Sequence, residues 1–323
     1  MAKKSTFPGL IRAIGLRLLY GLVSLIFLSL ATFAIDEIAP GDAALVRAGE
    51  KASQATIERI RKEMGLDRPW PIRYVEYVAK AATGDLGTSN YGTREPVSKI
   101  IGQSIGVTLM IATPAILLAA AVGIALGTLA ALKQTKAQDQ LILGFSTLGV
   151  TLPNFVLAPV LVLLFAVQMN QLPTSWETPM RAPIYYYLIL PVLVLSLRPM
   201  ASLTRLTRAS MIETLSQEFI KLARAKGVPY WRIAIRHGLR NAILPVITAI
   251  GTSFGFLLTG SFIVETIFII PGMGQRTLGA ITQNDTPVIM ASVLVSGALF
   301  ILVNLVVDII QPILDPRIRE SQV

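Results

Sequence analysis

Apolar residues dominate six long stretches of the chain, and shorter polar segments separate them. A membrane-spanning helix needs about 20 mostly apolar residues to cross roughly 30 Å of hydrocarbon. We therefore predict an all-α polytopic membrane protein with six transmembrane helices. The predicted spans cover residues 18–35, 107–132, 141–167, 184–203, 242–264 and 288–310.

The polar segment between the first two runs, residues 36–106, is long enough to hold structure of its own. Ser53 can cap a helix that ends at Gly65, because serine accepts hydrogen bonds from the free amides of a first turn. Pro71 can open a second helix that ends near Gly84. These signals predict a helical loop that covers the outer face of the bundle, and a plain spacer is the alternative.

Composition agrees with a membrane protein and excludes several kinds of chemistry. Hydrophobic residues make up 53% of the 323-residue chain and charged residues 15%, with a mean hydropathy of +0.62. The chain has no cysteine, which excludes disulfides, thiolate metal sites and thiol nucleophiles. The first run follows basic residues and lacks a small-residue cleavage pattern, which predicts a retained anchor rather than a signal peptide.

The net charge of +10 is explained by membrane topology. Lysine and arginine are abundant in the loops at 133–140 and 204–241, whereas the short loops on the opposite side hold only Arg181 and Arg276. Because cytoplasmic loops carry the excess of basic residues, both termini are predicted to be cytosolic. Nucleic-acid binding is not needed to explain the charge.

The spans also lack the polar residues that many membrane functions require. The second to fifth runs carry no charged residue through their centres, which argues against an ion-driven transporter and an intramembrane enzyme. His237 is the single histidine, and no glycine-rich phosphate-binding loop is present. Asn154, beside Pro153, could face a pathway or could satisfy backbone groups that the proline leaves free. If ATP powers this protein, another polypeptide binds it.

The polar interval between the fourth and fifth runs contains the most specific pattern. A basic amphipathic helix at about 217–226 ends at Gly227, and Pro229 prevents its continuation. A second basic amphipathic segment follows, with Trp231 and Leu239 among its apolar residues. We interpret the interval as two short helices at an angle that form a docking surface. An amphipathic anchor for anionic lipid is the alternative.

The fragment LARAKG followed by RHGLRNAILP resembles the signature loop of permeases from binding-protein-dependent ATP-binding-cassette (ABC) importers. The resemblance is to the first permease of the dipeptide, oligopeptide and nickel group. Further fragments match in the same order: IAPGDAA, GLDRPWPIRYVEYV with GDLGTS, TLPNFVLAPVLVLLF, RLTRASMIETLSQEF, VETIFIIPGMGQ and LDPRIR. Ala43 stands where the family often has proline, and the acidic first position of the Glu-Ala-Ala signature is absent.

This resemblance implies a type I ABC importer permease of a bacterial inner membrane. Residues 1–35 would be the N-terminal segment and first helix, 36–106 the extracytoplasmic loop, 107–310 a five-helix core and 311–323 a cytosolic tail. It also implies a heterodimeric pore with a homologous second permease, two ATPase subunits that hold ATP and magnesium, and an extracytoplasmic binding protein. No cofactor or catalytic residue is expected in this chain.

The resemblance further assigns roles to particular residues. The helix before Gly227 would be the coupling helix that sits in a cleft of the ATPase, through Glu218, Lys221, Ala223, Arg224, Ala225, Lys226 and Gly227. The translocation path or the binding protein would meet Asn154, Glu265, Pro271, Gly272, Gly274 and Asp285. Glu265 is either an interfacial cap or a docking charge. The implied substrates are dipeptides and oligopeptides. The alternative substrates are nickel, glutathione or another small solute. The alternative class of protein is a channel that works without an ATPase.

Overall fold

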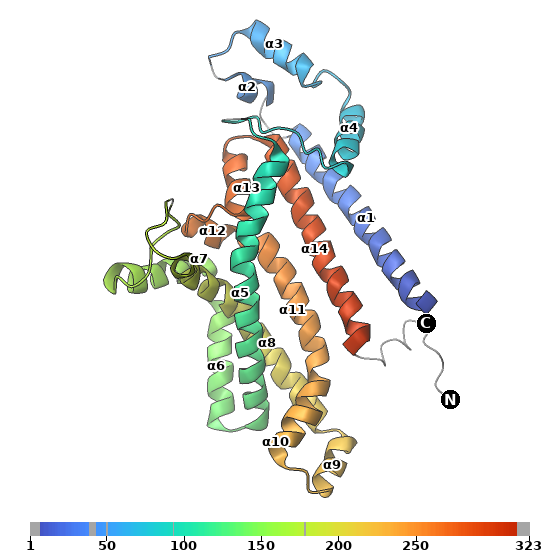
Figure 1. Cartoon of the computed structure of the whole chain (residues 1–323), viewed down its shortest axis with the longest axis vertical. Coiled ribbons are helices and arrows are strands. Elements are labelled where there is room, and N and C mark those ends of the chain that lie inside the picture. The colour runs from blue at the N-terminus through green and yellow to red at the C-terminus, as the bar shows by residue number, and fades with distance from the viewer. Residues whose placement is uncertain (1–6, 39–42, 50, 93, 178, 315–323) are drawn as a thin grey trace.

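The computed structural model describes residues 7–38, 43–49, 51–92, 94–177 and 179–314 (Figure 1). Within these ranges the regular elements are helices, joined by turns and irregular segments, with one isolated bridge between Thr88 and Pro96. The predicted all-α class is confirmed. Most of the predicted tail at 311–323 lies outside the described residues.

Among the described residues, five helices are long and apolar enough to cross a membrane, and the number rises to six if one bent pair of helices is counted as a single span. The long helices are α1 (Phe7–Ile38), α5 (Val97–Leu132), α8 (Ile184–Leu215), α11 (Arg240–Gly260) and α14 (Thr286–Leu314). They correspond to the predicted first, second, fourth, fifth and sixth spans, and several extend beyond them. In particular, α5 begins inside the segment that was predicted as extracytoplasmic loop, and α8 extends well into the predicted 204–241 loop.

The third predicted span, 141–167, is not one straight helix. It is divided between α6 (Ala137–Thr151) and a second arm made of α7 (Asn154–Leu161) and the π-helix η1 (Val162–Gln168), and the two arms meet at 102°. Leu152 has an extended backbone with ψ of 118° because the following Pro153 disfavours the helical region for the residue before it. The proline therefore separates the two arms.

The basic segment after Pro229 was predicted as a separate short helix, and the structure differs. Here α10 (Tyr230–Arg232) and the π-helix η2 (Ile233–Leu239) run directly into α11, so one apolar helical stretch covers Tyr230–Thr259. No proline lies between Pro229 and Pro245, Gly238 is accommodated within η2, and Pro245 lies inside α11. Only the first of the two segments, α9 (Glu218–Ala225), is an isolated short helix.

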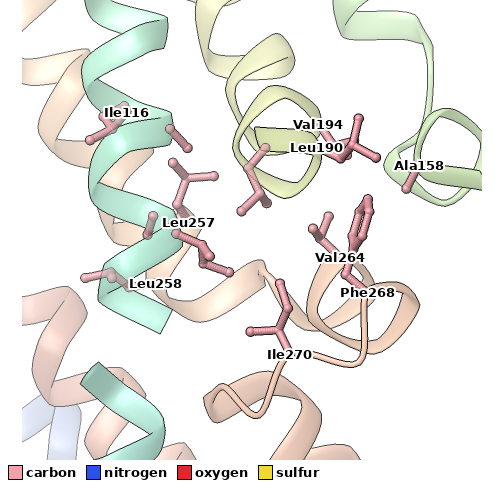
Figure 2. Packing of buried hydrophobic residues seen from close by; sticks show 13 residues of the cluster. Ile116, Ala158, Leu190, Val194, Leu257, Leu258, Val264, Phe268 and Ile270 are labelled. Atoms are coloured by element: carbon pink, nitrogen blue, oxygen red, sulfur yellow. The ribbon is translucent and has the colours of Figure 1, made fainter. Parts of the chain in front are cut away.

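Helices α5 and α8 form the most extensive contact in the bundle. A Cβ atom on Gly127 would lie 2.5 Å from the Thr204 carbonyl oxygen, and one on Gly123 would lie 2.9 Å from the Met200 carbonyl oxygen. These two glycines allow the backbones to approach, as small residues do in membrane helix pairs. Figure 2 shows the core beside this contact, where Leu190 and Val194 of α8 lie near Phe268.

Three short helices form the extramembrane loop: α2 (Ala43–Ala48), α3 (Gln54–Glu63) and α4 (Trp70–Ala82). The Thr56 amide donates to Ser53 Oγ at 3.3 Å, so the predicted cap of α3 is confirmed. Gly65 and Gly84 follow α3 and α4 with positive φ, at the predicted helix ends. Two further short helices, α12 (Phe262–Ile267) and α13 (Met273–Thr282), connect α11 to α14 and lie in the half of the molecule that carries α2–α4 (Figure 1).

Candidate functional site: a docking helix and the opposite loop

Helix α9 protrudes with α10 at the end of the bundle opposite α3 (Figure 1). Two backbone hydrogen bonds cap the C-terminus of α9. The Gly227 amide donates to the Arg224 carbonyl at 2.9 Å, and the Val228 amide donates to the Ala223 carbonyl at 3.2 Å. This is the Schellman arrangement, which requires a left-handed residue, and Gly227 has φ of +73°. The predicted glycine-specific turn is confirmed.

One apolar side chain anchors α9 to the rest of the protein. Ile220 is fully buried, and α9 packs against η2, where Ile233 and Ala234 are also buried. The i, i+3, i+4 spacing of Phe219, Leu222 and Ala223 predicts an apolar face that does not include Ile220. In the structure Ile220 is the buried residue, whereas Phe219 and Leu222 are exposed.

The remaining apolar residues of this end stay exposed. The exposed large side chains on α9, α10 and η2 are Phe219, Leu222, Tyr230, Trp231 and Ile235. The Arg224 guanidinium lies over the Tyr230 ring, 5.7 Å from its centroid. Lys221 Nζ pairs with Glu218 Oε1 at 2.7 Å on an open surface, where such a pair contributes about 0.3–0.5 kcal/mol. Ala225 and Lys226 are exposed, and Ala223 is half-buried. The result is a rigid helix with an apolar surface that nothing within the described chain covers.

A buried ion pair fixes the helix that carries α9. Arg208 of α8 makes two bonds to Asp139 of α6, from Nε to Oδ1 at 2.6 Å and from NH2 to Oδ2 at 2.8 Å. The Thr135 amide donates to the same carboxylate at 3.0 Å, and Asp139 is only 2% exposed. The end of α6 is thereby attached to α8 less than three turns before α9 begins.

We expect Asp139→Asn to lower the free energy of unfolding by about 2–3 kcal/mol. Removal of one partner of a buried pair costs about 3–5 kcal/mol, and the partial exposure of Arg208 reduces this figure. The measurement is thermal stability of the assembled complex in lipid. Glu218→Gln, which breaks the exposed pair with Lys221, is the matched control and should change stability by less than about 0.5 kcal/mol. Equal effects of the two substitutions would contradict this account.

At the other end of the molecule, Glu265 of α12 is completely buried. Its carboxylate accepts three hydrogen bonds: from Thr108 Oγ1 at 2.8 Å, from Ser261 Oγ at 2.6 Å and from the Gln275 amide at 3.1 Å. The Thr108 hydroxyl in turn accepts from the Met273 amide at 2.8 Å. Glu265 and Thr108 together cap the first turn of α13, where a negative charge is favoured. Of the two roles considered, the geometry gives Glu265 that of a cap.

The Pro271–Gly272–Met273–Gly274 turn is shaped around this carboxylate. A Cβ atom on Gly272 would lie 2.4 Å from Glu265 Cδ, and one on Gly274 would lie 2.7 Å from the Phe262 Cα atom. Both glycines are needed because the backbone passes too close to α12 for any side chain. The turn and the glutamate are thus one structural unit that joins α5, α12 and α13.

Asp285 is the other buried carboxylate at this end, and it anchors the extramembrane loop. It accepts hydrogen bonds from the Ser89 hydroxyl and, at 2.9 Å, from the Asn90 amide. Beside this contact a groove of about 860 Å³ opens between the loop, α5 and α13, and its lining includes Pro271, Arg276 and Asp285. Glu265 and Gly274 lie behind the groove rather than in its lining.

Asn154 lies far along the chain from this groove, at the first position of α7, directly after the Pro153 bend. Its side chain is half-buried and makes no hydrogen bond among the described residues. The structure therefore brings Pro271 and Asp285 together at one groove, and it leaves Asn154 at a separate place.

A bundle of apolar helices with an exposed docking helix at one end is the architecture of a multi-pass membrane subunit that works with partner proteins. Two family models match the chain: "Binding-protein-dependent transport system inner membrane component" over residues 123–320, and "Binding-prot-dependent transport system membrane comp, N-term" over residues 10–112. The chain belongs to this family. It is a multi-pass inner-membrane permease subunit of an ABC importer, a transport component and not an enzyme.

Relatives with similarity over nearly the whole length support the same assignment. A probable peptide ABC transporter permease protein of Sinorhizobium fredii is 35% identical, with 89% of this chain and 92% of the relative covered. The glutathione transport system permease protein GsiC of Escherichia coli is 37% identical, with 93% and 97% covered. Among solved structures, the inward-facing MetNI methionine ABC transporter matches with a TM-score of 0.52 and 14% identity, over 71% of this chain and 99% of that chain. The last comparison shows the fold.

Proposed function

We propose that this chain is one of the two permeases of an ATP-driven importer for dipeptides and oligopeptides, which a binding protein delivers from outside the membrane. The observation that carries the proposal is α9. It is a short helix closed by a glycine turn, anchored by Ile220 and otherwise exposed. A helix of this kind can fill a groove in a partner and transmit rigid-body motion to α8.

The partner at α9 would be an ATPase subunit, with ATP and magnesium bound there and not in this chain. Two such subunits and a homologous second permease would complete the complex, with the pore between the two permeases. The Lys/Arg asymmetry supports cytosolic termini and a cytosolic α9. The groove beside Asp285 would then open on the side where the binding protein delivers substrate.

Glutathione is the second candidate substrate, because a relative that is 37% identical is named a glutathione permease. Glutathione is itself a peptide-like molecule, so the two candidates share the chemistry of amide, amine and carboxylate groups. No feature of the described residues favours nickel over these substrates. Nickel therefore remains an alternative that rests on the sequence resemblance.

Cysteine crosslinking can test the docking proposal, since the chain contains no cysteine of its own. Ala225→Cys on exposed α9 should crosslink to the ATPase subunit in the assembled complex. Thr88→Cys, on the opposite side, is the control and should instead react with impermeant reagents from the extracytoplasmic side. Labelling of Thr88→Cys only from the cytosol would overturn the topology, and failure of Ala225→Cys to reach the ATPase would overturn the docking.

A further inference from the structure

Helix α4 has a side that contacts α1, an exposed apolar side, and a charged side that lies between them. Its covered side lies on α1: the Arg73 guanidinium pairs with Glu37, and the Tyr74 ring meets the Phe33 ring edge-on at 5.5 Å. At about 100° per residue, the exposed side chains of Ile72, Val75 and Ala79 lie together on the side away from Tyr74. Ile72 is 50% exposed and Val75 65% exposed.

The charges of α4 lie on its third side. Arg73 lies at the border with the covered side, where it pairs with Glu37. Glu76 Oε1 pairs with Arg68 Nη1 at 2.7 Å, and Lys80 is exposed. Separate charged and apolar sides on one short helix are typical of helices that lie in a membrane interface. The same pattern also occurs at protein interfaces, so the depth of α4 relative to the membrane decides between the two.

The contacts of α1 with α14 define the limits of the apolar zone. Arg17 pairs with Asp308 at 3.1 Å at one end, and the Thr286 hydroxyl donates to Asp36 at 2.8 Å at the other. Residues 18–35 between these contacts carry no charge. The 19 steps from Arg17 to Asp36 correspond to about 28 Å of helix, close to the roughly 30 Å thickness of a hydrocarbon core.

Tyr74 reaches below the edge of this zone. Its hydroxyl lies 2.9 Å from Ser29 Oγ and 3.2 Å from the Ile26 carbonyl oxygen. Ser29 and Ile26 are about 10 and 15 Å along α1 from Asp36. The pairing of Arg73 with Glu37 places the start of α4 beside the last turns of α1 (Figure 1). If residues 18–35 fill the hydrocarbon core, α4 then lies at its boundary with water.

The neighbouring surface of α1 is apolar and exposed. Val23, Phe27 and Leu30 are exposed on a side of α1 that meets neither α4 nor α14, and Phe27 is 71% exposed. Within the described chain, no other helix is among the main contacts of α4.

We propose that α4 is an interfacial helix whose Ile72, Val75 and Ala79 stripe rests on the acyl chains of one membrane leaflet. Trp70, at its start and 49% exposed, would lie at headgroup level, where tryptophan is enriched. The lipid contact would hold the extramembrane loop at a fixed height above the groove beside Asp285. This proposal does not depend on which substrate the complex transports.

Site-directed spin labelling of the assembled complex in lipid nanodiscs tests this proposal. Single nitroxides at Val75→Cys and Ala79→Cys should show a several-fold higher ratio of oxygen to nickel-chelate accessibility than one at Arg59→Cys on α3. Phe27→Cys on α1 is the positive control, and Glu76→Cys on the charged side of α4 should resemble Arg59→Cys. The two α4 positions are measured in separate variants. If one variant assembles poorly, the other still tests the proposal.

Accessibility at Val75→Cys and Ala79→Cys equal to that at Arg59→Cys would overturn the proposal. Protection of the two positions that develops only when the binding protein is added would also overturn it, because the occupant would then be a protein. A high ratio of oxygen to nickel-chelate accessibility that the binding protein does not change would support the membrane contact.

Discussion

Replacing Gly227 with valine should abolish most coupled transport while the membrane bundle stays assembled. Gly227 has φ of +73°, and a residue with a Cβ atom in the left-handed region costs about 1–2 kcal/mol, more for a β-branched one. A Cβ atom at this position would meet nothing within 4 Å, so the cost is backbone strain and not a clash. At about 1.4 kcal/mol per factor of ten, productive docking of α9 should weaken roughly tenfold or more.

Asparagine is the matched control because it tolerates the left-handed conformation better than other residues with side chains. Gly227→Asn adds a side chain at the same position and should keep most of the transport activity. Ala223→Glu, which adds bulk and charge on α9 without altering the turn, should weaken docking as Gly227→Val does. The readouts are substrate uptake and substrate-stimulated ATP hydrolysis by the reconstituted complex. Wild-type coupling in both Gly227→Val and Ala223→Glu would mean that α9 is not the coupling element.

The second large effect is expected at Glu265. Replacement by leucine removes the acceptor of three hydrogen bonds and leaves the Gln275 amide and two hydroxyls to find other partners inside the protein. Each buried donor that stays unpaired costs about 1–3 kcal/mol, so we expect a loss of roughly 3 kcal/mol or more. The junction of α12, α13 and α5 should loosen, and transport should fall with it.

Glu265→Gln keeps an acceptor oxygen of nearly the same shape and should cost less than half as much. Thermal stability of the complex in lipid and protease sensitivity of residues 265–287 would measure both variants. A carboxylate that served mainly as a docking charge would behave differently, because Glu265→Leu would then impair binding-protein docking without loss of stability.

Local sequence signals predicted the elements that depend on neighbouring residues. The turn at Gly227 and the cap at Ser53 follow from a glycine or serine at a helix end, and both are present. The bend at Pro153 was only partly predictable, since a proline in an apolar run indicates either a kink or a helix start. Here the extended backbone of Leu152 separates two arms at 102°.

Contacts between distant residues could not be predicted from the sequence. Asp139 and Arg208 are 69 positions apart, and Thr108 and Glu265 are 157 apart. Each was visible in the sequence as a polar residue near the end of an apolar run. The pairing of these polar residues depends on how α5, α6, α8 and α12 pack against one another. Likewise, the helical stretch from α10 into α11 is continuous because no proline lies between Pro229 and the start of α11. The change from basic to apolar composition had suggested a boundary there.

The most direct test of the central proposal is uptake of a labelled tripeptide into proteoliposomes that contain both permeases and the two ATPase subunits. We predict that accumulation above the external concentration requires ATP and the binding protein, and that Gly227→Val removes it while the subunits remain assembled. Downhill flux of the peptide through this chain without ATP or binding protein would contradict the account and identify a passive channel.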